Sequence, residues 1–279
     1  MNMVMSKEKK KEKSRETGEL VATVPGVELL TIMDLLSVTN IDARITVDYN
    51  GNIESKLVDP SHVTMVRIKL GEDVSQNNKK FDLDLSRVRN FMKKAKWGKT
   101  TGRGDAKTYA EMLNIFYESN RGIMRINTTR DDTTTVGFEV KLLDSMGMNP
   151  PNVPKLDLPA QVTISGQEFL NRVDLCKQAG DLMSVEIEDG QLVTYTGNDQ
   201  GKVFVDGKNE TAKSDGGKMK AQYSLTYLHP IAKAFKNQEI TIKTGENFPM
   251  VIECDWNFGY ETRTMKVEYF LAPRVEGDY

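Results

Sequence analysis

The segment GVELLTIMDL at residues 26–35 returns as GQEFLNRVDL at residues 166–175, at an offset of 140 residues. A second pair keeps this offset: LSRVRNFMKKAK at residues 85–96 and LTYLHPIAKAFK at residues 225–236. Solenoid repeats have periods of roughly 20 to 50 residues, whereas each half of this chain is long enough to bury a core of its own. The sequence therefore predicts a tandem repeat of one domain.

Composition places the chain among ordinary globular proteins. Of its 279 residues, 38% are hydrophobic and 28% charged, and no apolar run approaches the length of a membrane span. We expect no membrane contact and a location in the cytoplasm or nucleoid, or in the nucleus if the source is a eukaryote. The net charge of −2 excludes a uniformly basic surface, so any nucleic-acid contact must use local clusters of positive charge. Cys176 and Cys254 give no basis for a disulfide framework.

The spacing of apolar residues predicts the same order of elements in each half. Antiparallel strands with a few helices on one face make the expected fold class α+β. Three of the predicted helices span residues 27–38, 167–179 and 226–237. The other begins at Ser86 as its N-cap and runs through the lysines that follow. The predicted strands span residues 20–23, 41–49, 53–58, 63–70, 81–85, 111–118, 122–128 and 135–143, then 158–164, 182–188, 191–196, 202–205, 219–223, 239–244, 250–255 and 263–271.

The two halves are expected to be separate domains joined by a stiff linker. Pro150, Pro151 and Pro154 stand within five residues, and prolines cannot join the interior of a sheet. The N-terminus carries a charged run without an apolar segment after it, which indicates a disordered tail and not a secretory signal. The predicted boundaries are 1–18 for the charged tail, 19–143 for the first domain, 144–157 for the linker, 158–271 for the second domain and 272–279 for the C-terminal tail.

Motifs for catalysis and metal binding are weak. His62 and His229 have no Cys, Asp or Glu at ligand spacing, so we predict no metal site. Gly98, Lys99 and Thr100 resemble the end of a phosphate-binding loop but lack its earlier glycine and its following helix. We expect no catalytic residue, no cofactor and no enzymatic activity. A duplicated hydrolase or nuclease would instead require clustered carboxylates and metal-dependent turnover.

Matching positive charges occur on the second predicted helix of each half. Lys93 and Lys96 correspond to Lys233 and Lys236 across the offset, and Arg89 lies on the same helix as the first pair. A single charged helix face is usually only solvated, but the duplication favours a shared role. If these helices line one concave surface, their side chains would contact the phosphates of duplex DNA without reading bases.

The segment YFLAPRVE at residues 269–276 resembles the C-terminal signature of the sliding clamps of archaea and eukaryotes, the proliferating cell nuclear antigen family. VDPSHV at residues 58–63 resembles a motif of the family's first domain, and residues 246–250 resemble the second-domain counterpart. The resemblance covers roughly residues 20–276. It implies two similar domains with antiparallel sheets outside and helices on the inner face, in a homotrimeric ring around double-stranded DNA. It also implies a processivity factor for a DNA polymerase that a clamp loader places on DNA.

In this family neighbouring subunits join strand to strand, so the resemblance places the contact between residues 137–143 of one subunit and 201–207 of the next. The interface side chains would be Phe138, Val140, Leu142, Val203 and Val205. The resemblance also implies a pocket beside the linker for short peptides of the polymerase and of other replication and repair proteins. The family positions of this pocket and of the tail beside it fall on Leu57, His62, Val63, Met146, Met148, Pro249, Phe270, Ala272, Pro273, Arg274 and Val275.

One alternative stays open within the same fold: a clamp-fold processivity subunit that acts as a monomer or in a heteromeric ring. Weak or polar edges at residues 137–143 would favour it, whereas the alternation of Val136, Phe138, Val140 and Leu142 favours pairing. The loop at residues 98–107 is extra relative to a compact clamp, and its role is open, as is that of the N-terminal tail.

Overall fold

The computed structural model describes residues 18–97, 100–101, 109–130, 133–144, 156–198, 201–258 and 263–274. These residues form two compact units. Unit 1 takes the described residues of Met1–Asp34, Asp42–Ile53 and Glu72–Met148, and unit 2 those of Leu35–Ile41, Glu54–Gly71 and Asn149–Tyr279. The predicted N-terminal tail before residue 18, most of the extra loop, the linker from 145 to 155 and the tail beyond residue 274 lie outside the described residues. The domain boundaries given above stay a prediction.

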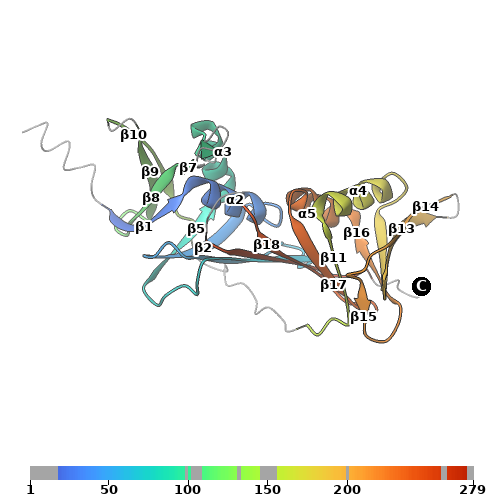
Figure 1. Ribbon diagram of the computed structural model, residues 1–279. Helices are drawn as coiled ribbons and strands as arrows, with labels where there is room; N and C mark the ends of the chain where they lie inside the picture. The colour runs from blue at the N-terminus through green and yellow to red at the C-terminus, as the bar shows by residue number, and fades with distance from the viewer. Residues whose placement is uncertain are drawn as a thin grey trace, which may run out of the picture. The chain divides into compact units, whose positions relative to one another are not determined.

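Unit 1 contains a four-stranded antiparallel sheet, two further antiparallel strand pairs and two helices (Figure 1). The order in the sheet is β1 (Glu19–Pro25), β8 (Met112–Glu118), β9 (Ile123–Arg130) and β10 (Thr134–Lys141). The strands β2 (Asp42–Asp48) and β5 (Asn78–Asp84) pair antiparallel, as do the short β6 (Thr100–Thr101) and β7 (Tyr109–Ala110). The helices are α2 (Gly26–Leu36), most of which belongs to this unit, and α3 (Leu85–Ala95).

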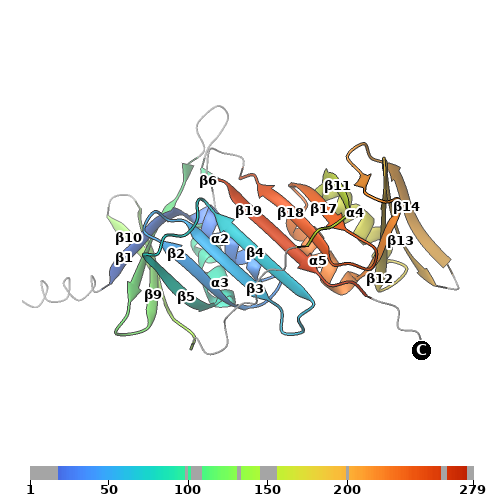
Figure 2. The same cartoon turned by 90° about the horizontal axis from the view of Figure 1, so that it is seen from below.

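Unit 2 contains two sheets and the helix pair α4 (Gly166–Lys177) and α5 (Leu225–Phe235), which pack side by side on one face of the strands (Figures 1 and 2). One sheet has the order β14 (Gly201–Lys208), β13 (Gln191–Asn198), β12 (Leu182–Glu188) and β16 (Met219–Ser224). In the other sheet the strands follow as β15 (Lys213–Ser214), β11 (Ala160–Ser165), β17 (Glu239–Thr244), β18 (Met250–Trp256), β19 (Met265–Leu271), β4 (Thr64–Leu70) and β3 (Ile53–Val58).

The predicted α+β class is confirmed, because antiparallel sheets are covered by a few helices. Each predicted helix and strand has an observed counterpart whose ends differ by a few residues. The predicted N-cap Ser86 is wrong. Helix α3 begins at Leu85, and the Asp84 carboxylate accepts hydrogen bonds from the backbone N–H groups of Ser86 and Arg87. An aspartate caps a helix as well as a serine does, so the sequence alone did not distinguish the two.

A glycine begins the first helix of each repeat, and the fold requires it there. The Gly166 N–H donates to the Gln238 carbonyl at 2.7 Å, and a β-carbon at Gly166 would lie 1.9 Å from the Phe235 carbonyl oxygen. At Gly26 a β-carbon would lie 2.2 Å from the Trp97 carbonyl oxygen. In both repeats the start of the first helix therefore contacts the backbone at the C-terminal end of the second helix. Only a residue without a side chain fits this contact.

The cores lie between the helices and the sheets. In unit 2 the fully buried rings of Phe235 on α5 and Tyr269 on β19 meet edge to face, with ring centroids 5.6 Å apart. The Tyr269 hydroxyl donates to the carbonyl oxygen of Leu35, so the ring fills the core while its polar end is satisfied.

We predict that Gly166→Ala lowers the free energy of unfolding by about 2 kcal/mol or more, since the methyl group forces the backbone of α4 and α5 apart. Gly201→Ala is the matched control, because no atom of the described residues beyond its chain neighbours lies within 4 Å of the position that its β-carbon would take; the control should stay within about 0.5 kcal/mol. Urea unfolding of both variants measures the difference. Equal stabilities would contradict the close contact at Gly166.

Candidate docking pocket and helix faces

A largely apolar pocket of about 260 Å³ opens in unit 2. Its floor is a small buried cluster of Met65, Val251 and Phe270, with Val58 and Leu158 packed against it. These side chains come from neighbouring strands, because Met65 on β4 stands opposite Phe270 on β19, and Phe270 stands opposite Val251 on β18. The lining residues are Val58, His62, Val63, Thr64, Met65, Leu156, Pro249, Phe270, Leu271 and Ala272.

The loop between β3 and β4 is shaped by the buried carboxylate of Asp59. Its oxygens accept hydrogen bonds from the backbone N–H groups of Ser61 at 2.9 Å, Val63 at 2.7 Å and Thr64 at 2.5 Å. The turn leaves His62 with a φ of 57°, a conformation that costs energy for a residue with a side chain. Asp59 therefore holds His62 and Val63 at the rim of the pocket.

The chain leaving β19 passes along the same side. The Ala272 N–H donates to the Val63 carbonyl at 2.9 Å, and the Arg274 N–H donates to the Gln222 carbonyl at 2.7 Å. Pro273 between them has no N–H. In the described part of this tail, an incoming peptide could therefore pair only with carbonyl oxygens.

Five of the residues predicted for the pocket line it: His62, Val63, Pro249, Phe270 and Ala272. Leu57 is buried, and its neighbour Val58 packs on the pocket cluster, so Leu57 points to the opposite face of β3. Pro273 and Arg274 are described but do not line the pocket. Met146, Met148 and Val275 lie outside the described residues.

The predicted pocket residues did not include Val58, Thr64, Met65, Leu156 and Leu271. For Met65 a signal was available. Strand β4 alternates, and Met65 shares a face with Arg67 and Lys69, while Phe270 shares a face with Lys266 and Glu268. An apolar residue at the end of a charged face on two strands indicates a local contact surface.

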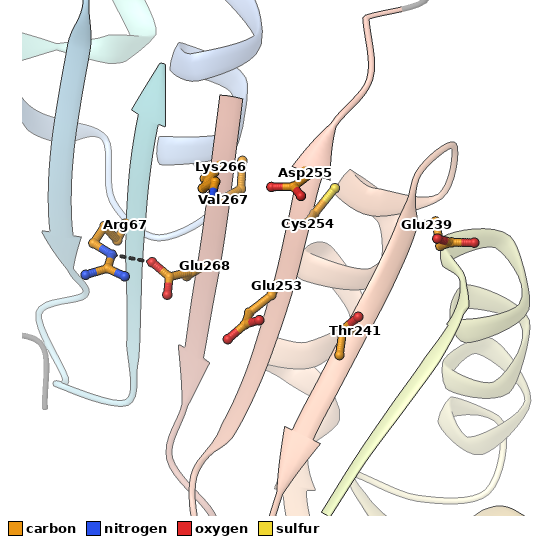
Figure 3. Close-up of a pocket in the computed structure, with 9 residues that line it drawn as sticks. All are labelled: Arg67, Glu239, Thr241, Glu253, Cys254, Asp255, Lys266, Val267 and Glu268. Atoms are coloured by element: carbon orange, nitrogen blue, oxygen red, sulfur yellow. Dashed lines mark hydrogen bonds and ion pairs between the residues drawn. The ribbon is translucent and has the colours of Figure 1, made fainter. Parts of the chain in front are cut away.

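The other end of this face is charged (Figure 3). A groove of about 430 Å³ there is lined by Arg67, Glu239, Thr241, Glu253, Cys254, Asp255, Lys266, Val267 and Glu268. Arg67 and Glu268 form an ion pair across β4 and β19, and Lys243 Nζ lies 2.8 Å from Glu253 Oε1. Because these strands are charged at one end and apolar at the other, an apolar partner is expected to bind only at the end that forms the pocket.

In unit 1 the predicted DNA-facing charges are partly neutralised. Asp34 on α2 lies 2.7 Å from Arg89 Nε and 2.8 Å from Lys93 Nζ on α3. In the second repeat the equivalent carboxylate is Asp174, and His229 Nε2 lies 3.1 Å from its Oδ1. The same carboxylate position thus joins the two helices of each repeat.

The exposed charges on these helices are unevenly placed. Lys96 ends α3 with a φ of 61° and a solvent-exposed side chain. Lys233 lies in the last turn of α5, Lys236 follows it as the C-cap, and both are exposed. Of the other two residues predicted to face DNA, Lys93 is also exposed and Arg89 is half-buried, and both pair with Asp34.

The two strands predicted for the subunit contact are sheet edges: β10 ends the sheet of unit 1, and β14 ends the smaller sheet of unit 2. The side chains predicted for the interface are buried or half-buried within their own unit. Phe138 stacks on Phe91 with ring centroids 4.6 Å apart, and Val140 is 4% exposed. Leu142, Val203 and Val205 are half-buried. Among the described strands, none pairs with the outer backbone N–H and C=O groups of β10 or β14.

The described residues offer little for catalysis. Burial raises the pKa of the Cys176 thiol to about 11 and that of Cys254 to about 12, so both are poor nucleophiles at neutral pH. Within the described ranges, no three His, Cys, Asp or Glu side chains lie close enough together to hold a metal ion. No described helix is long and apolar enough to cross a membrane.

No protein-family model matches the chain, but individual relatives do. A DNA polymerase sliding clamp of Methanococcoides burtonii is 26% identical over 264 residues, which cover 92% of this chain and 99% of the relative. The DNA polymerase sliding clamp of Archaeoglobus fulgidus is 25% identical over 270 residues, which cover 94% of this chain and 98% of the relative. The chain is a homologue of the archaeal DNA polymerase sliding clamps.

The clamp homologue also shares its fold with solved clamps. Archaeoglobus fulgidus PCNA with the C-terminal region of FEN-1 bound matches with a TM-score of 0.75 and 20% identity, covering 93% of this chain and all 100% of that one. PCNA of Thermococcus kodakaraensis matches with a TM-score of 0.73 and 17% identity, covering 92% of this chain and 100% of that one.

Proposed function

We propose that this protein is a DNA polymerase sliding clamp, a processivity factor without catalysis of its own. The observation that carries the proposal is the match to archaeal clamps over almost the whole chain, in sequence and in fold. In the proposed assembly, three copies close into a ring around double-stranded DNA. A clamp loader places the ring, and a polymerase and other replication and repair proteins dock on it.

The proposed contact with DNA is electrostatic and independent of sequence. Lys96, Lys233 and Lys236 extend into solvent from the helices or their ends, and lysines that meet phosphates hold DNA without reading bases. The overall charge of −2 is low for a protein that binds DNA by affinity. A ring that holds DNA by enclosing it needs little affinity, and the carboxylate of Asp34 keeps the attraction weak.

The pocket fits the proposed docking role. It is concave and mostly apolar, and Ala272 of the tail lines it, which suits a short peptide that inserts apolar side chains. We also propose the domain boundaries at 143 and 158, the role of residues 144–157 as the linker, and a location with the DNA, in the nucleoid or nucleus.

The ring is tested by the solution mass of the purified chain. We expect light scattering at moderate salt to give three times the chain mass of 31.4 kDa over a range of protein concentrations. A mass of one chain at every concentration would refute the homotrimer and favour a clamp-fold subunit that acts alone or in a heteromeric ring.

The pocket is tested with Val63→Asp. Val63 is half-buried at the rim, so the variant should fold, but a bound apolar peptide would have to desolvate the new carboxylate. We expect calorimetry to show binding of a C-terminal FEN-1 peptide about ten-fold weaker or worse. Val27→Asp, at a half-buried valine in the first turn of α2 outside the pocket, places its carboxylate where a helix N-terminus favours it and should bind normally. If both variants bound the peptide with equal affinity, the pocket would not be part of the docking site.

The role of Asp34 is tested with Asp34→Asn. Loss of this carboxylate frees Arg89 and Lys93 to contact phosphates, so we expect about three-fold tighter binding to duplex DNA at low salt and a steeper salt dependence. Asp215→Asn changes the net charge equally at an exposed turn and should leave DNA binding unchanged. An identical gain in both variants would show that only net charge matters and would contradict a DNA-facing α3.

A further inference from the structure

The backbone hydrogen bonds show which residues of the two edge strands can pair between neighbouring copies. This inference rests on the proposed ring. The edge strands β10 and β14 each contain eight residues. Unpaired edges bind other strands through backbone N–H and C=O groups, and in antiparallel pairs these groups point alternately to either side. The hydrogen bonds already made therefore reveal which residues of each strand face the open edge.

On β10 the odd-numbered residues face the open edge. The Leu142 N–H donates to the Gly122 carbonyl at 2.8 Å, toward β9, and the register of β9 with β10 is unbroken from Thr134 to Lys141. Even-numbered residues thus bond to β9, whereas the backbone groups of Gly137, Glu139 and Lys141 point outward.

On β14 the even-numbered residues face the open edge. The Asn209 N–H donates to the Gly190 carbonyl at 2.9 Å, toward β13, and the register of β13 with β14 is unbroken from Gly201 to Lys208. The backbone groups of Lys202, Phe204 and Asp206 are therefore the ones left for a partner strand.

The side chains give the same rule independently. Phe138 stacks on Phe91 of α3, and Val205 stands opposite the buried Thr194 and accepts a hydrogen bond from Arg172 of α4 at its carbonyl oxygen. Even residues of β10 and odd residues of β14 thus face the helices. A continuous sheet with all helices on one face must set these residues opposite each other. Odd residues of β10 then meet even residues of β14, as the backbone requires.

Two antiparallel registers satisfy this rule and pair seven residues of each strand. One sets residues 134–140 against 207–201, with Gly137 opposite Phe204 and Glu139 opposite Lys202. The other sets residues 135–141 against 208–202, which places Lys141 opposite Lys202. Like charges directly opposite are destabilising, and opposite charges are favourable. Charge therefore selects the first register.

The first register also covers the most exposed apolar side chain of the smaller sheet. Phe204 is 66% exposed and would lie across the strand from Gly137, which has no side chain to fill the space. An aromatic ring opposite a strand glycine covers the bare backbone and stabilises the pairing. Tyr195 stands beside Phe204 on β13, with Lys202 Nζ 3.9 Å from its ring centroid, so the aromatic surface is continuous.

We propose that β10 of one copy pairs with β14 of the next copy of the same chain in this register. Glu139, whose carboxylate already lies 3.4 Å from the Arg121 guanidinium of its own copy, then also forms a cross-strand ion pair with Lys202 of the neighbouring copy, and Phe204 of that copy packs over Gly137. Glu139 and Phe204 recognise a second copy of this chain on one face of the joined sheet, while on the helix face the register sets Phe138 opposite the half-buried Val203 of that copy.

The experiment measures the concentration at which half of the assembly dissociates, by light scattering or sedimentation. Glu139→Lys alone and Lys202→Glu alone each place like charges opposite each other in every contact, and each should raise this concentration about five-fold or more. The double variant Glu139→Lys/Lys202→Glu restores an ion pair at every contact, so its concentration should be at least about three-fold lower than that of Glu139→Lys, which loses the same contact with Arg121.

Lys208→Glu is the matched control. It reverses an exposed lysine on the same strand, and in the proposed register residue 208 lies beyond the end of β10. It should leave assembly unchanged and should fail to rescue Glu139→Lys. Rescue by Lys208→Glu would instead establish a register shifted by six residues and overturn the proposal, as would a double Glu139→Lys/Lys202→Glu variant as weak as the single variants. Thermal unfolding of each variant separates loss of assembly from loss of folding.

The two proposals fail in different ways. If the unmodified chain stays monomeric at every concentration, the ring itself is refuted and this register with it. If the unmodified chain is trimeric and the charge reversal is not rescued, the ring stands and only the register is wrong.

Discussion

The contact of the backbone at Gly26 and Gly166 with the end of the neighbouring helix is the constraint on which each repeat depends. With β-carbon positions 2.2 Å and 1.9 Å from carbonyl oxygens, neither site accepts any other residue without displacement of a helix. The contact fixes how the first helix of the repeat lies against the second. The carboxylates of Asp34 and Asp174 then bridge to the partner helix at the same relative position, so the paired helices form one face.

With the helices fixed on one side of the strands, the remaining surfaces are left for partners. Strand alternation sends one set of side chains to the core and the other to solvent. On β4 and β19 the solvent set is charged at Arg67 and Glu268 but apolar at Met65 and Phe270. The apolar end, closed by the Asp59 turn, is the proposed docking pocket. The outer edges of β10 and β14 are the proposed subunit contact.

The duplication and most helices and strands could be predicted from the sequence, because they depend on short sequence patterns or on the repeat itself. The offset of 140 residues identified the duplication, and turn and periodicity signals gave the elements within a few residues. The floor of the pocket could not be predicted in this way. It depends on Met65 standing opposite Phe270, a pairing of residues about two hundred positions apart that no local pattern specifies. The cap Asp84 was missed because two good capping residues stand close together, and the neutralisation of Arg89 by Asp34 required the helix packing.

The central claim, that the protein holds DNA by enclosing it, is tested most directly on a duplex fixed to beads at one end. The protein is added while the far end is open, and that end is then either blocked with a bulky bound protein or left open before a wash at moderate salt. A ring that has passed over the open end should stay on the blocked duplex and be lost from the open one. Equal retention on both would show ordinary side-on binding and contradict the account.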